Sequence, residues 1–283
     1  MTGNSHNSKA RKHAVIAGAG VAGLTVALAL AGKGFKVTLC ERTGVFSEVG
    51  AGLQLSPNVT RLLKRLGVLD PLLTRATVTK AIALLSAKSG EMLLSLSTTA
   101  APQSDGAPFL AVHRADLQAV LVAKALETPD ISIRPGLTFQ SVSEMDGKIE
   151  VTFLHGEEPH RVEADILIGA DGVWSTVRSA VPGHSDTRYS GYTAWRATVA
   201  VSDTLPAAFR NLCANQTVGA FLSPGAHLVA YPLRAGSLLN LVLVTQGTDS
   251  THGWDNSVDL AVLAQTLEQF EPSLRDCLAS ITN

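Results

Sequence analysis

Only three cysteines, Cys40, Cys213 and Cys277, occur among the 283 residues. Their spacing matches no metal-binding pattern, and an odd number of thiols cannot all pair within one chain. A small fold held together by disulfides is therefore excluded, and we predict no metal site. The scarcity of cysteine also favours a reducing compartment, so the predicted location is cytoplasmic.

Charge is also sparse. Charged residues make up 17% of the chain against 46% apolar residues, and the net charge is −1. A disordered regulator would show the opposite balance. Neither sign of charge dominates, so nucleic acid and anionic membranes are not expected partners. The expected partner is a small molecule. The length allows one large domain or two that pack closely.

One stretch, residues 14–32, carries no charge and follows Lys9, Arg11 and Lys12, which is the outline of a secretory signal. Three glycines within six residues would weaken a continuous apolar helix, and the strand-like run Val37–Leu39 follows almost at once. A strand, a turn, a helix and a second strand explain the pattern better. We therefore predict no membrane insertion, with a signal peptide or a membrane anchor as the alternative.

The turn in this unit has the sequence GAGVAG, residues 18–23. It follows a predicted strand at Ala14–Ala17 and opens a predicted helix at Ala22–Ala31, the context in which G-x-G-x-x-G binds a pyrophosphate. Glu41 stands 18 residues after Gly23, at the end of a second predicted strand, where a carboxylate can accept the ribose hydroxyls of a dinucleotide. The alternative is a tight turn without a ligand. Dinucleotide binding is favoured, but NAD and FAD both present an ADP half.

The rest of the chain predicts an α/β fold with a second, mostly β lobe. An amphipathic helix begins after Ser56, with Val59, Leu62, Leu63 and Leu66 as its buried stripe. A hairpin at Ile82–Leu96 belongs to another sheet, and a further hairpin turns at Asp146-Gly147. Beyond Pro182, strand-like segments at Tyr192–Val201, Thr217–Leu222, His227–Leu233 and Leu238–Thr245 alternate with turn residues, and a closing helix spans Leu260–Leu267.

Several segments together resemble one family. They are the glycine loop with Glu41-Arg42, the stretch Gly50–Asn58, the segment His113–Leu117, and Asp165–Gly172. This combination is similar to the single-component FAD-dependent aromatic hydroxylases, and most similar to the salicylate hydroxylase and 3-hydroxybenzoate 6-hydroxylase type. The resemblance runs from about His13 to about Phe270.

The resemblance implies a Rossmann-like FAD-binding domain of the glutathione-reductase type at residues 13–78 and 105–182. A mostly β substrate lobe would comprise residues 79–104 and 183–283. The implied reaction hydroxylates a phenol or hydroxybenzoate-like acid with NADH or NADPH and O2. The implied FAD-binding residues are Gly18, Gly20, Ala22, Gly23, Glu41, Arg42, Gly52, Gln54, Arg114, Asp171 and Gly172.

Some of these residues have structural alternatives. Asp171 could simply cap the turn into the next segment, the Gly50–Pro57 stretch could be an ordinary connection, and Arg114 could form a surface ion pair at the start of a helix.

In the second lobe, His227 and Tyr231 are the predicted catalytic residues. On a strand they share one face, about 13 Å apart at roughly 3.3 Å per residue, so they could line two ends of one pocket. Histidine suits removal of a phenolic proton because its ordinary pKa lies near neutrality. The resemblance implies the same role for His227, with Tyr231 positioning the substrate; the alternative is a structural histidine. Arg196 could hold a substrate carboxylate, or form a cross-strand ion pair.

One departure from the family stands out. A second Gly-Asp motif, typically Gly-Asp-Ala-Ala-His-Pro, completes the flavin site in the family and is absent from the 283 residues. We therefore expect a truncated member that alone retains FAD weakly and oxidises NAD(P)H to hydrogen peroxide without hydroxylated product. An inactive flavin-binding remnant and an NAD-dependent dehydrogenase are the alternatives. The oligomeric state is not predicted.

Overall fold

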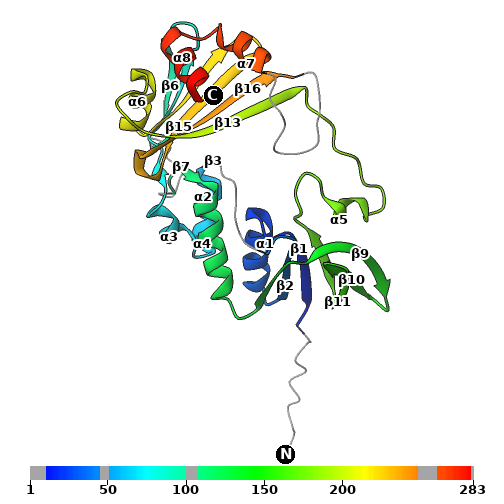
Figure 1. Cartoon of the computed structure of the whole chain (residues 1–283). Coiled ribbons are helices and arrows are strands. Elements are labelled where there is room, and N and C mark those ends of the chain that lie inside the picture. The colour runs from blue at the N-terminus through cyan, green and yellow to red at the C-terminus, as the bar shows by residue number, and fades with distance from the viewer. Residues whose placement is uncertain (1–10, 45–50, 100–106, 248–259, 282–283) are drawn as a thin grey trace, which may run out of the picture. The chain divides into compact units, whose positions relative to one another are not determined.

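The computed structural model describes residues 11–44, 51–99, 107–247 and 260–281. The chain divides into two compact units (Figure 1). Unit 1 comprises Met1–Glu48 and Leu117–Thr187, and unit 2 comprises Val49–Asp116 and Arg188–Asn283. Among the described residues, no helix has the length and apolar character needed to cross a membrane.

Unit 1 is built on a parallel sheet of four strands in the order β12-β1-β2-β8. The predicted strand–turn–helix–strand unit is confirmed, with α1 joining β1 to β2. The elements of unit 1 are β1 (His13–Ala17), α1 (Val21–Ala31), β2 (Lys36–Glu41), α4 (Arg114–Leu126, whose first turn belongs to unit 2), β8 (Ile131–Pro135), β9 (Thr138–Met145), β10 (Lys148–His155), β11 (Glu158–Ala164), β12 (Ile166–Gly169) and α5 (Thr176–Ser179).

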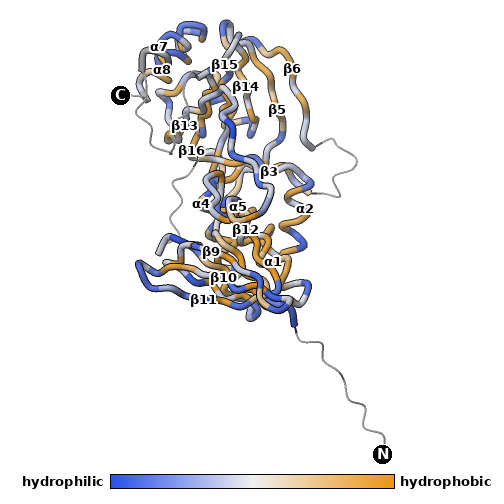
Figure 2. Tube along the Cα trace, turned by 90° about the vertical axis from the view of Figure 1, so that its right-hand side faces the viewer, coloured by the Kyte–Doolittle hydropathy of each residue, from blue (hydrophilic) through white to orange (hydrophobic). Residues whose placement is uncertain are grey.

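Helix α1 is apolar along most of its length (Figure 2). Its buried residues Gly23, Leu24, Ala27 and Leu28 form one face, as expected for a helix that covers a sheet. The helix can be apolar because it covers a parallel sheet, whose strands are buried on both faces.

Strands β9, β10 and β11 form a separate antiparallel sheet. The predicted hairpin at Asp146-Gly147 is confirmed, and both residues have positive φ, of 44° and 78°. Two residues with positive φ make the turn whose twist matches that of the flanking strands. Phe139 and Phe153 from this sheet pack with Val15 and Cys40 of the parallel sheet in one buried core.

Unit 2 is built on a sheet of six strands in the order β13-β16-β15-β14-β5-β6. The predicted hairpin at Ile82–Leu96 is confirmed as β5 and β6, and it joins the strands of the second lobe as expected. The elements of unit 2 are β3 (Gly52–Leu55), α2 (Pro57–Arg65), α3 (Leu69–Leu73), β4 (Thr77–Val78), β5 (Ala81–Ser86), β6 (Met92–Ser97), β7 (Leu110–His113), β13 (Tyr192–Ala200), α6 (Ala207–Ala214), β14 (Thr217–Ser223), β15 (Ala226–Leu233), the 3₁₀ turn η1 (Arg234–Gly236), β16 (Leu238–Gln246), α7 (Leu260–Leu267) and α8 (Pro272–Ile281).

One face of this sheet is buried under helices. Leu228 of β15 and Leu243 of β16 point into a core that includes Phe209 of α6, Leu263 of α7 and Leu274 of α8. Side chains on a strand alternate between the two faces. The residues between these apolar positions therefore lie on the opposite face of the sheet.

Strands β3, β7 and β4 form a small antiparallel sheet that the sequence did not predict. Helix α2 starts after Ser56 as predicted, but the proposed stripe was wrong in part. Leu63 is buried, whereas Leu62 is 53% exposed, because Thr60 occupies the buried position instead.

By packing, residues 49–116 belong to unit 2 together with the six-stranded sheet. The sequence placed 49–78 and 105–116 with the FAD-binding domain. Strands β3 and β4 both pair with β7, and Ala111 of β7 is buried against Val218, Tyr231 and Leu233 of the six-stranded sheet. Which segments bind the cofactor stays a prediction.

Candidate functional site

The glycine loop of unit 1 lies where β1 ends and α1 begins. Gly18 has a φ of +102°, and a Cβ there would lie 2.4 Å from the carbonyl oxygen of Ala170. A Cβ on Gly23 would lie 1.9 Å from the carbonyl oxygen of Gly18. These two glycines are therefore required for the turn and for its packing.

Gly20 is different, because no described atom lies within 4 Å of a Cβ placed there. It is the N-cap of α1, it makes no side-chain capping bond, and the first turn of the helix contains no acidic residue. Ala22 lies exposed in the same turn. Open space in front of an uncapped helix N-terminus leaves backbone N–H groups available to an anion.

Glu41 at the end of β2 lies beside this loop. Its Oε2 accepts the N–H of Ala19 at 2.8 Å, and its Oε1 accepts the N–H of Thr43 at 2.9 Å. Arg42, the next residue, is exposed. These hydrogen bonds hold the carboxylate next to the loop.

Gln118 of α4 was missed in the sequence analysis. It is 7% exposed, and its Nε2 donates to the carbonyl oxygen of Ala19 at 3.3 Å. The backbone of Ala19 is thus fixed at two points: its N–H donates to Glu41, and its carbonyl oxygen accepts from Gln118. In the sequence, the only sign of this role is that Gln118 falls among the apolar residues with the spacing of the buried face of α4.

The Asp171-Gly172 turn lies against the same loop, because β12 runs parallel to β1 and both strands end at the same edge. The Asp171 carboxylate accepts the hydroxyl of Ser175 at 2.6 Å and the N–H of Thr176 at 2.8 Å. Burial alone would raise its pKa. The hydrogen bonds from Ser175, Val177 and Thr176 outweigh burial, and the pKa lies below the ordinary value. Gly172 has a φ of +86°, with open space around it.

The hydrogen bonds that Asp171 accepts from Thr176 and Val177, at the start of α5, predict a pH-dependent contribution to stability. Asp171→Ala should lower the free energy of unfolding by roughly 0.5–2 kcal/mol at neutral pH. Because the folded-state pKa is lowered, the contribution is complete above the unfolded pKa and is lost as the pH falls through the lowered folded-state pKa. Urea unfolding of the wild type and the variant between neutral and acid pH measures it. Asp186→Ala, at an exposed position, is the control. A difference that does not shrink at acid pH would contradict this role.

In unit 2, the predicted catalytic and substrate residues lie on the sheet face opposite the helices. Across the strands, Arg196 and Val229 both stand opposite Val242. His227 and Tyr231 share this face with Val229, because all three alternate along β15. The sequence placed His227 and Tyr231 on one face, and the strand register shows that Arg196 lies on the same face.

Burial differs along this surface. His227 is half-buried, whereas Tyr231 is 3% exposed. Burial raises the pKa of Tyr231 to about 12, and the charge of Arg196 and the amide of Asn240 act in the opposite direction. The Tyr231 phenol is therefore neutral at physiological pH.

The other predicted residues of unit 2 lie on β3 and at the start of α4. Gly52 is buried, and Gln54 is exposed. The N–H of Arg114 donates to the carbonyl oxygen of Ala51 at 3.3 Å, which ties the start of α4 to the beginning of β3. Gly50, the first residue of this predicted stretch, lies outside the described residues.

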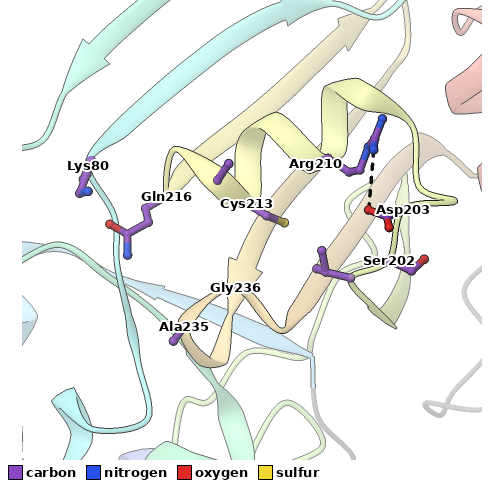
Figure 3. A pocket seen from close by; sticks show the side chains of 10 residues that line it. Lys80, Ser202, Asp203, Arg210, Cys213, Gln216, Ala235 and Gly236 are labelled. Atoms are coloured by element: carbon purple, nitrogen blue, oxygen red, sulfur yellow. Dashed lines mark ion pairs between the residues drawn. The ribbon is translucent and has the colours of Figure 1, made fainter.

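A hollow of about 590 Å³ also occurs in unit 2 (Figure 3). Lys80, Cys213 and Gln216 line it, together with Arg210, whose Nη1 lies 3.9 Å from a carboxylate oxygen of Asp203. None of the predicted site residues lines this hollow. It is a surface feature separate from the sheet face that carries His227.

Comparison with known proteins gives one family and many relatives. The family model described as "FAD binding domain" matches residues 11–271. The chain is 38% identical to the FAD-dependent monooxygenase OpS4 of Beauveria bassiana, over 82% of this chain and 54% of that protein. It is 35% identical to the 3-hydroxybenzoate 6-hydroxylase of Klebsiella oxytoca, over 81% of this chain and 56% of that protein. The chain thus spans about half the length of the curated relatives it matches.

Solved structures show the same fold. HpxO of Klebsiella pneumoniae, solved with FAD and uric acid, has a TM-score of 0.76 at 22% identity and covers 95% of this chain and 64% of that one. CtdE, solved with FAD and a substrate, has a TM-score of 0.78 at 20% identity, with coverage of 95% and 65%. The predicted α/β fold is confirmed.

Proposed function

Because the chain belongs to the FAD-dependent aromatic hydroxylase family, as its sequence resemblance predicted, we propose that it binds FAD and hydroxylates a small aromatic substrate with NADH or NADPH and O2. The observation that carries this proposal is the glycine loop. Gly20 offers open space at an uncapped helix N-terminus, with the Glu41 carboxylate beside it.

The residues of this loop fit the ADP half of FAD. Backbone N–H groups at the start of α1 would bind the pyrophosphate, and Gly20 allows its oxygens to approach the backbone. Glu41 would accept the adenosine ribose hydroxyls in exchange for its present bonds to Ala19 and Thr43. The roles of Arg42, Gly52, Gln54, Arg114, Asp171 and Gly172 toward FAD are part of the same proposal.

When bound, FAD supplies the redox chemistry, taking electrons from NADH or NADPH and activating O2 for electrophilic attack on an aromatic ring. The residues of this chain would bind the ring and raise its electron density. Nε2 or Nδ1 of His227 would accept the proton of a substrate hydroxyl, because the phenolate is more electron-rich than the phenol. The guanidinium of Arg196 would hold a substrate carboxylate with two hydrogen bonds, and Tyr231 would position the substrate.

The substrate class follows from these groups. A cation and a base on one sheet face, separated by the apolar Val229 and Val242, suit an aromatic acid that also carries a hydroxyl group. Relatives are named for 3-hydroxybenzoate and for 3-amino-4-hydroxybenzoate, which have this chemistry. A hydroxybenzoate-like acid is therefore the proposed substrate.

Product analysis tests the activity. The purified chain is incubated with FAD, NADH or NADPH and a panel of hydroxybenzoates, and hydroxylated product and hydrogen peroxide are both measured. Stoichiometric product supports the proposal and would show that the second Gly-Asp motif is not required for hydroxylation. Hydrogen peroxide without product is the result expected of the 283 residues alone, and tight NAD binding without flavin would favour the dehydrogenase.

Glu41 gives a specific prediction for the cofactor. Glu41→Lys should weaken the binding of FAD and of ADP alike, by about tenfold or more, because it removes the acceptor for the ribose hydroxyls. Calorimetric titration of each ligand measures this. Glu144→Lys, an equal charge reversal at an exposed position of β9, is the control. Equal affinities for the Glu41 variant and the wild type would remove Glu41 from the site.

A further inference from the structure

Asn240 is an unusual residue for its position. It lies in β16 between the buried Leu239 and Leu241, and none of its surface is exposed. Burying an amide costs free energy unless its groups are hydrogen-bonded. A polar side chain at this place in the sheet therefore needs a specific explanation.

The hydrogen bonds of Asn240 point to β3. Its Oδ1 accepts the N–H of Gly52 at 2.6 Å, across 188 positions of sequence, and lies 3.5 Å from the hydroxyl of Thr198. Its Nδ2 is buried and has no hydrogen-bond partner among the described residues. Gly52 lies on the edge strand of the small sheet, so Asn240 supplies an acceptor at the edge that faces away from β7.

Tyr231 completes the arrangement. It stands directly opposite Asn240 in the strand register, so both side chains lie on the same sheet face. A Cβ on Gly52 would lie 2.6 Å from Cε2 of Tyr231 and 3.0 Å from Cγ of Asn240. The two side chains therefore pack so closely against residue 52 that only a glycine fits there.

We propose that Asn240 is a positioning residue that, with Tyr231, fixes Gly52 and the strand β3, and so the position of Gln54 on that strand. The inference rests on the proposed function, in which Gly52 and Gln54 lie along the flavin. It assigns Asn240 no role toward the ADP half of FAD. Asn240 should therefore affect FAD binding and leave ADP binding unchanged.

The experiment compares the affinities of FAD and ADP for the whole chain. Asn240→Leu keeps the approximate volume and removes the acceptor of the Gly52 N–H. We expect the dissociation constant of FAD to rise about tenfold while that of ADP stays within about twofold. The visible absorption band of the bound flavin should also change shape. Asn240→Asp retains an acceptor oxygen for Gly52 and should restore most of the affinity.

Thr198→Val is the matched control, because it alters a neighbour of Asn240 on the same face without removing the bond to Gly52. Gly52→Ala is a second route to the same result, since its Cβ would displace β3 from Tyr231. If the Asn240 and Gly52 variants bind FAD and ADP equally weakly, or bind both as the wild type does, the inference about Asn240 is wrong. Either result would leave the proposed function standing. Failure of the wild type to bind FAD would overturn the proposed function as well.

Discussion

Replacing His227 with asparagine in a complete form of the protein is expected to lower the rate of aromatic hydroxylation by about 10²- to 10⁴-fold, the range for loss of a general base. Asparagine is close in size and polar, but it cannot accept a proton near neutral pH. FAD binding should be unchanged, because the proposal places His227 toward the substrate. Hydroxylated product formed per unit time, measured with saturating FAD, gives the rate.

His184→Asn is the control for this variant, because His184 is exposed. A variant rate equal to that of the wild type from about pH 6 to 9 would make His227 a structural residue.

Substituting the glycines of the loop with alanine should give two opposite results. Gly23→Ala should destabilise the fold by about 1–3 kcal/mol or more, because its Cβ would lie 1.9 Å from a backbone oxygen and the chain must move. Gly20→Ala meets no atom and has φ and ψ that alanine adopts, so its cost should stay below about 1 kcal/mol. Gly20→Ala should nevertheless weaken FAD binding by about 10- to 100-fold, because its methyl group occupies the approach of the pyrophosphate.

Urea unfolding without ligand and calorimetric titration with FAD separate these effects. The expected pattern is loss of stability for Gly23→Ala and loss of affinity with near-normal stability for Gly20→Ala. Normal FAD affinity in Gly20→Ala would show that the ligand does not approach the helix N-terminus at this residue.

The strand–helix–strand unit of the glycine loop could be predicted because its signals are local. Glycines at 18, 20 and 23 interrupt an apolar run, and a strand-like run follows within the length of one helix. Glu41 could be predicted for the same reason, since the end of β2 is a short distance away along the chain. In the structure the unit forms as predicted, and Glu41 accepts the N–H of Ala19 in the loop.

The limits of sequence reasoning appear where contacts are distant in sequence. The small sheet of β3, β7 and β4 pairs Gly52 with His113, and no local pattern encodes that pairing. The helix predicted near Leu260–Leu267 is confirmed, but α8 after Pro272 was not predicted.

The candidate site shows the same division. His227 and Tyr231 could be placed on one face because strand periodicity is local, whereas the position of Arg196 on that face depends on the pairing of β13 and β15 with β16. Asn240 and Gln118 could not be recognised, because each acts through a main-chain atom that lies 188 or 99 residues away. Both side chains stand out only because they are polar and buried, and burial depends on the whole fold.

The most direct test of the account is a calorimetric comparison of FAD and NAD binding to the wild-type chain. The loop, Glu41 and the family together predict that FAD binds more tightly than NAD and that the bound protein shows the visible spectrum of a flavin. Tighter binding of NAD than of FAD would contradict the flavin assignment, and with it the proposed hydroxylation.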